Sequence, residues 1–227
     1  MKHFITALAL SISALTATAQ DIFDNPDNHA HLGVRLSYEL ACPTDVHYSI
    51  ANINVLDAGS GFSAGVIYNI PVWKNLFFEP GATLYYNTYS FSNDIISNIG
   101  DFDPAFDDLN ISGASVRQWG MRLPLIVGYH FDFIPEMRLS FFTGPELTLG
   151  FSAKTHLDMG KISGSANAYG SDGFLNRCDV KWRFGVGATF FDHYYAAISG
   201  AAGICDVYKD ALSMRSNLFD ITIGYNF

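Results

Sequence analysis

Hydrophobic and polar residues alternate one by one along much of this chain. The alternation is clearest over 32–40, 117–131, 137–151, 180–190 and 219–227, and it is weaker over 61–70, 77–90 and 194–204. Because successive side chains of a β-strand point to opposite faces, a period of two predicts strands. The pattern therefore predicts eight strands. Most of them reach the length of about nine residues that a tilted membrane-spanning strand needs.

The connections between these predicted strands alternate in length. Short ones lie at 71–75, at 132–136 and near 192–193, whereas 41–59, 92–113, 152–178 and 205–215 are long and rich in Asn, Asp, Ser and Gly. Outer-membrane barrels have short turns on the periplasmic side and long loops outside. The spacing therefore favours a barrel with both chain ends on the periplasmic side.

The two faces of the predicted strands differ in the size of their side chains. One face carries Leu, Ile, Val, Phe and Trp, and the other carries Gly, Thr and Asn with a few charged residues. An eight-stranded barrel has room inside for side chains only, so we expect the small and charged set inside and the bulky set against lipid. Aromatic residues near the strand ends resemble interfacial girdles. They are Tyr38, Phe62, Tyr86, Trp119, Phe131, Phe151, Phe190, Tyr194, Tyr225 and Phe227.

These patterns predict an all-β fold, an eight-stranded antiparallel up-and-down transmembrane β-barrel. After the N-terminal segment, no apolar run is long enough for a membrane-spanning helix. In a bilayer, a closed barrel is the other structure that satisfies every backbone polar group. A soluble, ligand-binding β-barrel is the structural alternative, because the composition alone permits it.

The N-terminus has the features of a secretory signal peptide. Lys2 precedes the apolar stretch 4–15, and Ala17-Thr18-Ala19 supplies the small residues that signal peptidase recognises. We expect residues 1–20 to be removed and 21–227 to form the barrel domain, exported through the periplasm to the outer membrane of a Gram-negative cell. The net charge of −9 argues against nucleic acid as a partner, because phosphate binding needs clustered Lys and Arg.

Several ionisable residues fall on the face that we expect to line the lumen. They are Arg35, Glu39, Glu79, Arg122, His130, Arg138, Glu146, Lys181, Arg183 and Asp220. Buried charges need partners, and the two signs are nearly balanced here. The set predicts a structural network that fills the lumen. A gated ion path, opened by exchange of Arg–Glu partners, is the functional alternative.

The three cysteines lie near the outer ends of predicted strands. Cys178 and Cys205 are almost symmetric about the turn near 192, so the sequence predicts a cross-strand disulfide between them in an oxidising compartment. Cys42 remains unpaired in this prediction.

No residue pattern indicates catalysis or a cofactor. His130, His156 and His193 are the candidate bases for a serine hydrolase that modifies lipid A, but none lies in a recognisable triad spacing. The acidic loop lacks the register of a calcium-binding loop. It contains Asp94, Asp101, Asp103, Asp107 and Asp108. We therefore expect a non-enzymatic protein without cofactor or metal.

The stretch 122–131 and the Phe141-Phe142-Thr143-Gly144-Pro145-Glu146-Leu147 strand resemble the PorT-like outer membrane β-barrel family. Ser152-Ala153-Lys154 and the 179–187 strand also fit this pattern. The resemblance implies an integral outer-membrane barrel. It also implies that the terminal Phe227 is read by the barrel-assembly machinery. The expected partners are outer-membrane lipid and lipopolysaccharide, that machinery, and surface or secretion-apparatus proteins.

Overall fold

The computed structural model describes residues 29–44, 46–48, 51–53, 56–91, 113–134, 136–159, 162–169, 173, 175–207 and 214–227. The elements that it contains are β1 (His31–Pro43), β2 (Val46–Tyr48), β3 (Ala51–Ile53), β4 (Gly59–Trp73), β5 (Leu76–Ser90), β6 (Gly113–Ile134), β7 (Met137–Met159), β8 (Ile162–Asn167), β9 (Cys178–Phe190), β10 (Tyr194–Gly203) and β11 (Ser216–Asn226). Within these ranges, no helix is long and apolar enough to cross a membrane.

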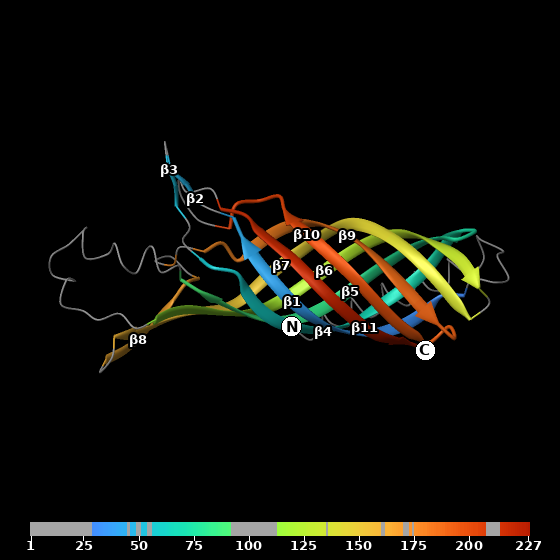
Figure 1. Ribbon diagram of the computed structural model, residues 1–227, viewed down its shortest axis with the longest axis horizontal. Helices are drawn as coiled ribbons and strands as arrows, with labels where there is room; N and C mark the ends of the chain where they lie inside the picture. Colours follow the sequence, from blue (N-terminus) through green and yellow to red (C-terminus); the bar gives the residue numbers. More distant parts are fainter. Residues whose placement is uncertain are drawn as a thin grey trace, which may run out of the picture.

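Eight of these strands close into one antiparallel barrel. The sheet order is β6-β5-β4-β1-β11-β10-β9-β7, and a further pairing of β6 with β7 closes it. The first and last barrel strands are neighbours, with Gly33 opposite Asn226 at one end and Pro43 opposite Ser216 at the other. The strands are strongly tilted to the long axis of the molecule (Figure 1). The predicted fold class is confirmed.

The strands extend the predicted segments at several ends. The turn after β4 is Lys74-Asn75, and the turn after β9 is 191–193. Lys74, Phe191 and Asp192 have positive φ angles there, which suits the tight turns of antiparallel hairpins. These short connections all lie at one end of the barrel, which we call the turn end. The opposite end is the loop end.

The largest difference from the predicted strands is at the loop end. The segment 152–178 was expected to be a connection, but β7 runs on to Met159 and pairs there with β8. The extended parts of β6, β7 and β8 project beyond the rest of the barrel (Figure 1). The connection 41–59 likewise contains the paired strands β2 and β3. A bulge at Phe151 interrupts the alternation, because Trp119 is opposite Ser152 whereas Gly120 is opposite Gly150.

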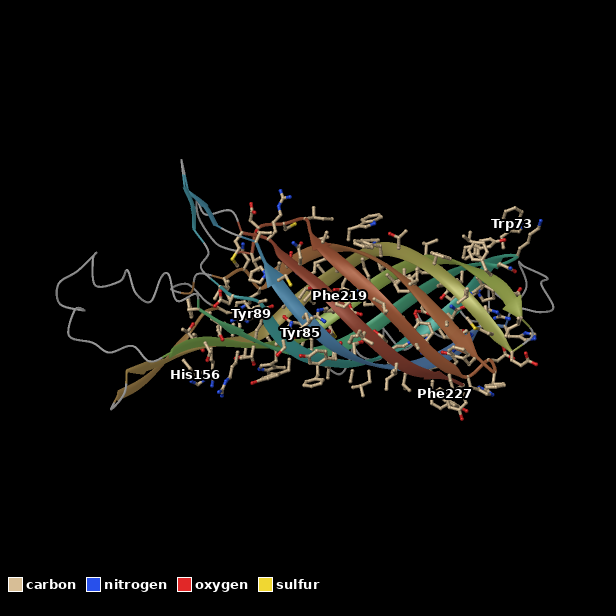
Figure 2. The ribbon with its side chains drawn as sticks, viewed as in Figure 1. Trp73, Tyr85, Tyr89, His156, Phe219 and Phe227 are labelled. Carbon is tan, nitrogen blue, oxygen red and sulfur yellow. The ribbon has the colours of Figure 1, made fainter. Side chains whose placement is uncertain are left out.

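The bulky apolar face points away from the barrel axis. Leu36, Phe184 and Ile223 are 51%, 55% and 58% exposed, whereas inward Glu39, Arg122 and Asp220 are at most 2% exposed. Phe219 and Tyr85, both labelled in Figure 2, follow the same rule, because Phe219 is 44% exposed whereas Tyr85 is 3% exposed. A soluble barrel has the opposite distribution. This surface therefore matches a hydrocarbon environment.

Aromatic side chains form two belts on the outer surface. At the loop end Tyr38 packs edge-on against Phe62 and Trp119 against Phe151, with ring centroids 5.3 and 5.2 Å apart. A second belt, at the turn end, contains Tyr129, Phe131, Phe141, Tyr194, Tyr225 and Phe227. A strand rise of about 3.3 Å per residue and a tilt of about 40° place Trp119 and Phe131 about 30 Å apart along the barrel axis. This separation is close to the thickness of a bilayer core.

Two polar side chains between the belts, Trp182 and Thr143, are hydrogen-bonded to each other. The Trp182 indole N–H donates to Thr143 Oγ1 at 2.8 Å, and the Thr143 hydroxyl donates to the Arg183 carbonyl at 3.0 Å. Trp182 is 47% exposed and lies on the lipid-facing side of β9. Because acyl chains offer no hydrogen-bond partners, this local pairing lets an indole face lipid without an unsatisfied donor.

Candidate functional site in the barrel lumen

A chain of five alternating charges crosses the middle of the lumen, and we call it the ion-pair chain. It consists of Glu39 on β1, Arg122 on β6, Glu146 on β7, Arg183 on β9 and Asp220 on β11. Each residue reaches the inside because its strand alternates small or charged residues with bulky apolar ones. All five are buried or nearly so. The ion-pair chain therefore connects strands that are not neighbours in the sheet.

The contacts of the two arginines hold the ion-pair chain together. Arg122 makes a two-pronged contact with Glu39, with Nη2 donating to Oε2 at 2.8 Å, and its Nε lies 3.7 Å from Glu146. Arg183 donates to Glu146 at 2.7 Å and to Asp220 at 2.6 Å. Paired guanidinium and carboxylate groups offset much of each other's desolvation cost.

Neutral groups satisfy further positions along the ion-pair chain. The Ser199 hydroxyl accepts from Arg183 at 2.6 Å and donates to Asp220 at 2.7 Å. The Thr222 hydroxyl also donates to Asp220, at 3.1 Å. The Arg122 guanidinium lies over the Tyr85 ring, 4.2 Å from its centroid, in a cation–π contact. The network therefore ties Arg122 and Asp220 to uncharged neighbours as well as to opposite charges.

A second buried ion pair lies nearer the loop end. Lys181 Nζ contacts the Asp179 carboxylate and donates to the Ser216 carbonyl at 3.0 Å. Lys181 belongs to the predicted set, whereas Asp179 does not. Every second residue of β9 points inward, so Asp179 faces the lumen together with Lys181 and Arg183. The same alternation in the sequence could have identified Asp179 as an inward residue. It was missed because it stands at the very start of the strand.

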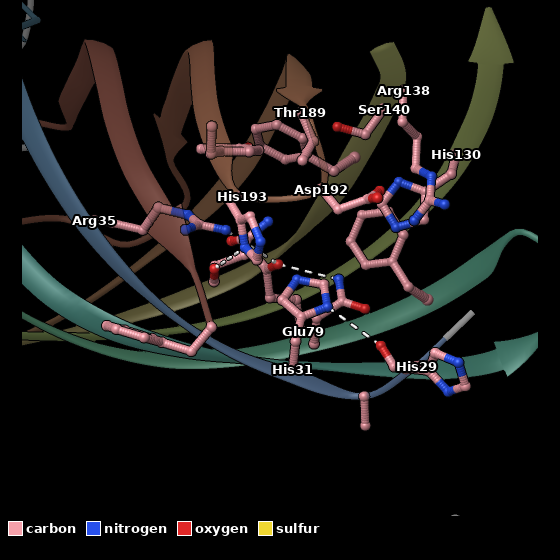
Figure 3. A pocket seen from close by; sticks show the side chains of 17 residues that line it. His29, His31, Arg35, Glu79, His130, Arg138, Ser140, Thr189, Asp192 and His193 are labelled. Carbon is pink, nitrogen blue, oxygen red and sulfur yellow. Dashed lines mark hydrogen bonds and ion pairs between the residues drawn. The ribbon is translucent and has the colours of Figure 1, made fainter. Parts of the chain in front are cut away.

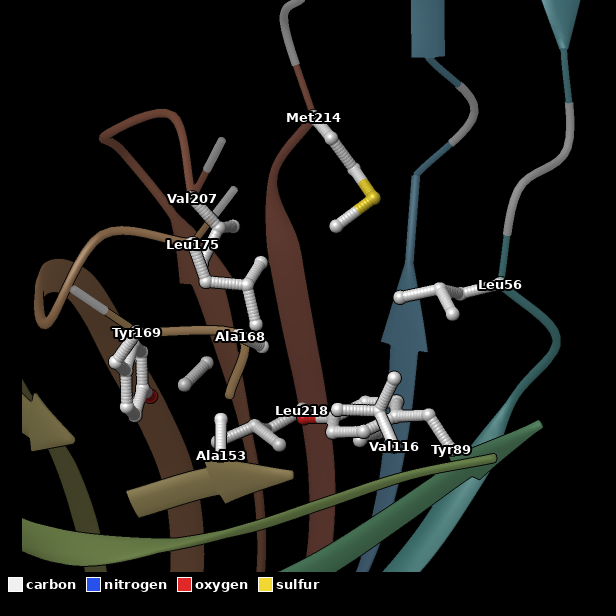
Figure 4. Packing of buried hydrophobic residues seen from close by; sticks show 12 residues of the cluster. Leu56, Tyr89, Val116, Ala153, Ala168, Tyr169, Leu175, Val207, Met214 and Leu218 are labelled. Carbon is white, nitrogen blue, oxygen red and sulfur yellow. The ribbon is translucent and has the colours of Figure 1, made fainter. Parts of the chain in front are cut away.

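An apolar cluster closes the lumen at the loop end, and we call it the loop-side cap. Its members are Ala41, Leu56, Tyr89, Val116, Ala153, Ala168, Tyr169, Leu175, Ala201, Val207, Met214 and Leu218. Figure 4 shows Leu175, Val207 and Met214, which come from outside the strands, packed over residues of the strand ends. Sequence reasoning missed the cap because it treated the long connections as polar. Single apolar residues within those connections were the available signal.

Tyr169 joins the cap to the polar lumen below it. Its hydroxyl accepts a hydrogen bond from the Gln118 amide, and its ring lies against Gly150, where a Cβ would overlap the hydroxyl. Burial raises the pKa of the Tyr169 hydroxyl above its ordinary value, so the group stays protonated. Arg177 lies 5.7 Å from the ring centroid. Gly150 is therefore needed where it stands, because a larger residue would displace the tyrosine.

The opposite half of the lumen contains a cavity of about 310 Å³ at the turn end, which we call the vestibule. Its lining residues include Arg35, Glu79 and His130, which Figure 3 labels, and also Asn226. Two smaller cavities lie further toward the loop end, one of about 80 Å³ beside the ion-pair chain and one of about 20 Å³ beneath the cap. A cavity that holds one water needs about 10–15 Å³, so the space beneath the cap suits a single molecule.

Buried polar atoms for which the described part of the chain offers no hydrogen-bond partner occur in the vestibule as well as in the ion-pair chain, where they are Arg122 Nε and Glu146 Oε1. Both ring nitrogens of His130, Asn69 Oδ1 and Asn226 Oδ1 are buried without a hydrogen-bond partner among the residues that the structure describes. Asn69 donates its amide to Glu79 at 3.2 Å. Glu79 also lies 3.9 Å from Arg35, and the Arg35 guanidinium lies over the Tyr195 ring. The free atoms face a cavity that has room for water.

Two residues of the predicted set lie apart from the central network. His130 stacks on Phe77 with ring centroids 4.2 Å apart, and it forms no ion pair among the described residues. Arg138 pairs with Asp132 at 3.0 Å at the turn-end rim, where the two side chains are 27% and 63% exposed. The remaining eight residues fall into two groups. Arg35 and Glu79 pair in the vestibule, and the other six lie in the ion-pair chain or beside it.

The predicted disulfide is wrong. Cys42, Cys178 and Cys205 are all exposed and unpaired. In the β9–β10 pairing Gly203 lies opposite Lys181, so the hairpin is centred at residue 192. If the same register continued, position 205 would lie opposite Asp179 and not opposite Cys178. A disulfide needs Cα atoms about 4.4–6.8 Å apart and converging Cβ atoms, and a slip of one residue turns the two thiols to opposite faces.

The candidate catalytic and metal-binding groups do not converge in the described residues. His193 contacts the Asn226 carbonyl through Nδ1 at 2.9 Å, and His156 lies on the outward side of β7. None of the three candidate histidines is hydrogen-bonded to a serine in the described part of the chain. No group of three potential ligands could hold a metal ion there either. The acidic loop residues, from Asp94 to Asp108, and the predicted signal peptide lie outside the described residues.

Comparison with known proteins identifies a family for this sequence. Residues 18–208 match the family described as outer membrane protein beta-barrel domain. The comparison with curated proteins found no match.

Solved structures similar to this chain include three bacterial proteins. One is Ail, the attachment invasion locus protein of Yersinia pestis, in complex with the heparin analogue sucrose octasulfate. Its sequence identity to this chain is 11%, the match covers 88% of this chain and 100% of that chain, and the TM-score is 0.40. Neisserial surface protein A has 11% identity, 88% and 100% coverage, and a TM-score of 0.43. OprG of Pseudomonas aeruginosa has 10% identity, 87% and 95% coverage, and a TM-score of 0.45.

Proposed function

Because this chain belongs to the outer membrane protein β-barrel domain family, we propose that it acts as a closed, non-enzymatic barrel. Its location in the outer membrane agrees with the prediction from the sequence. In the proposed role the lumen transports nothing, and the parts beyond the loop-side belt make the functional contacts. Surface or secretion-apparatus proteins are the proposed partners of these parts. Within the family, the residues quoted above support a PorT-like member.

The observation that carries this proposal is the double closure of the lumen. The ion-pair chain crosses the barrel from β1 to β11, and the loop-side cap lies above it. Between them the cavity measures only about 20 Å³. A conducting path needs continuous room for water and ions, and a cavity for about one water does not provide it. Opening would require Arg122 and Arg183 to lose buried partners, which is costly.

Conductance across a planar lipid bilayer tests the proposal. We expect the refolded mature protein, from residue 21 onward, to insert without steady openings, while a large porin conducts in the same bilayer. Heat-modifiable mobility on a gel should show in parallel that the inserted protein is a folded barrel. Steady openings of the folded protein would contradict a closed lumen.

A narrow channel for small solutes or ions is the second candidate. The vestibule of about 310 Å³ favours it, because a wide entrance at the turn end is a feature that a path would use. The same recordings decide between the two. The channel would be established if the native protein showed openings and if the Glu39→Gln variant showed openings with a different ion selectivity.

For the terminal residue we propose a role in assembly. Phe227 is 67% exposed, and its backbone N–H donates to the Leu32 carbonyl at 2.8 Å, which extends the β1–β11 pairing. Its ring packs edge-on against Tyr225 at the turn end. We expect Phe227→Ser to lower the amount of assembled barrel in cells but to leave refolding in detergent unchanged. A normal cellular level would contradict the role.

A further inference from the structure

A row of polar and cationic side chains lies on the outer surface beside the loop-side aromatic belt. Four neighbouring strands contribute one residue each, and cross-strand pairing links them in order. We call this set the cationic row. Its members are Thr88 on β5, Arg117 on β6, Lys154 on β7 and Asn167 on β8.

The two cations of this row point away from the lumen. Arg117 and Lys154 are exposed, whereas the preceding residues in each strand, Val116 and Ala153, are 1% exposed and face inward. The next outward pair, Ser115 and His156, extends the polar surface further from the membrane. In Figure 2, His156 lies at the loop end on the outside of the extended strands, opposite to the end that carries Trp73.

The height of the row matches the headgroup layer. Trp119 follows Arg117 by two residues on the same outward face and belongs to the loop-side aromatic belt. With a rise of about 3.3 Å per residue and a tilt of about 40°, the row stands about 5 Å beyond that belt. Aromatic belts sit at the level of the lipid headgroups, and long loops mark the outer leaflet. The row is therefore beside the headgroups of outer-leaflet lipids.

The pairing of Arg117 with Lys154 is unfavourable for an isolated barrel. They are direct cross-strand partners, and like charges at such positions repel. Neither forms an ion pair with a carboxylate among the side chains that the structure describes, whereas Arg138, the exposed arginine at the turn end, pairs with Asp132. The chain has 22 acidic and 13 basic residues, so two adjacent cations do not reflect a general basic excess. An anion between them would remove the repulsion.

We propose that Arg117 and Lys154 bind a phosphate group of an outer-leaflet glycolipid of the lipid A type. A guanidinium can hold phosphate with two parallel hydrogen bonds, and the ammonium group adds a point charge. Thr88 and His156 flank the pair and can donate further hydrogen bonds. The acyl chains of the same lipid would lie along the apolar surface around Trp119. This site is separate from the lumen and does not depend on whether the lumen conducts.

Binding of defined lipids tests the proposal. Native mass spectrometry of the full mature barrel, released from detergent, compares bisphosphorylated lipid A with dephosphorylated lipid A that has the same acyl chains. We expect the phosphorylated form to bind about tenfold more tightly, as charge-assisted hydrogen bonds imply. The Arg117→Gln/Lys154→Gln double variant should lose this preference. The Lys74→Gln/Arg138→Gln variant makes the same charge change at the turn end and should keep it.

Two further measurements complete the test, and the first distinguishes binding of a lipid phosphate from binding of other anions. Inorganic phosphate at the same concentration should not displace the lipid, because it lacks the acyl chains that contact the apolar surface. Heat-modifiable mobility should show that both double variants fold. Equal binding of the two lipid A forms, or full retention of the preference in Arg117→Gln/Lys154→Gln, would overturn the proposal. Tighter binding of a soluble sulfated oligosaccharide than of the phosphorylated lipid would also overturn it.

Discussion

The two halves of the lumen differ in how their charged groups are paired and in how much space lies beside those groups. Toward the loop end, Arg122 and Arg183 bind carboxylates directly and the apolar cap excludes water. Toward the turn end, His130 and Asn226 keep unpaired atoms beside a cavity of about 310 Å³. Unpaired buried atoms occur in both halves, and Arg122 Nε and Glu146 Oε1 are examples on the loop side, but the turn-end cavity has room for several waters whereas the cavity beneath the cap suits a single one. The same strands therefore build a tightly packed region and a region with room for water within one barrel.

The largest difference between the halves should appear when one charge of the ion-pair chain is removed. We expect Arg122→Ala to lower the free energy of unfolding by about 3–5 kcal/mol, because it leaves Glu39 and Glu146 buried without their partner. Urea unfolding of the barrel in lipid vesicles, followed by tryptophan fluorescence, measures this change. A loss below about 1 kcal/mol would mean that water reaches these carboxylates after all.

Truncation of the loop-side cap should have the next largest effect. Leu175 is 5% exposed within the cap, so Leu175→Ala should cost about 2–3 kcal/mol through lost burial and a new cavity. The same unfolding assay applies. Leu36→Ala, on the lipid-facing surface, removes the same atoms at a position that is 51% exposed and serves as the control. Equal losses for the two variants would argue against a packed cap.

A smaller effect is expected for the ion pair of the vestibule. Arg35 lies 3.9 Å from Glu79, and water in the vestibule can solvate that carboxylate when the arginine is absent. The two side chains are 9% and 14% exposed, against 3% and 2% for Arg122 and Glu39, so we expect Arg35→Ala to cost about 1–2 kcal/mol, less than Arg122→Ala. A cost equal to that of Arg122→Ala would show that the vestibule is as dry as the tightly packed half.

The smallest effect should follow from the loss of the vestibule histidine. Neither ring nitrogen of His130 has a hydrogen-bond partner within the described part of the chain, and the ring stacks on Phe77. His130→Leu removes the unpaired polar atoms but keeps apolar contact, so the free energy of unfolding should change by less than about 1 kcal/mol, or rise. A large destabilisation in the same assay would reveal that His130 makes a polar contact through bound water.

Local patterns in the sequence were sufficient for the strands and for the direction of most side chains. The alternation of apolar and polar residues around Phe184 and Ile223 identifies the lipid-facing side of the strands. Arg122 and Arg183 occupy the alternate positions, which point inward. The ion-pair partners could not be assigned in the same way. Glu39 on β1 meets Arg122 on β6, three strands away in the sheet, and that meeting depends on the tilt and stagger of the whole barrel.

Other features depend on single-residue register or on packing between connections. The cysteine prediction was wrong because the turn is centred at 192 and not half a residue earlier. The bulge at Phe151 reverses the parity of β7, so Ala153 faces inward and Lys154 faces outward. The cap brings together Leu56, Leu175 and Met214 from three connections, and no local sequence pattern predicts contacts between residues so far apart in the chain.

Thiol accessibility tests the asymmetry of the lumen most directly. His130 and Thr148 are almost equally buried, at 7% and 6% exposed, but His130 lines the vestibule whereas Thr148 lines the cavity beneath the cap. In a background with Cys42→Ser, Cys178→Ser and Cys205→Ser, we predict that a small charged thiol reagent labels His130→Cys quickly in the folded, detergent-solubilised barrel. Thr148→Cys should stay unlabelled until the protein is unfolded. Equal labelling rates at the two positions would contradict the account.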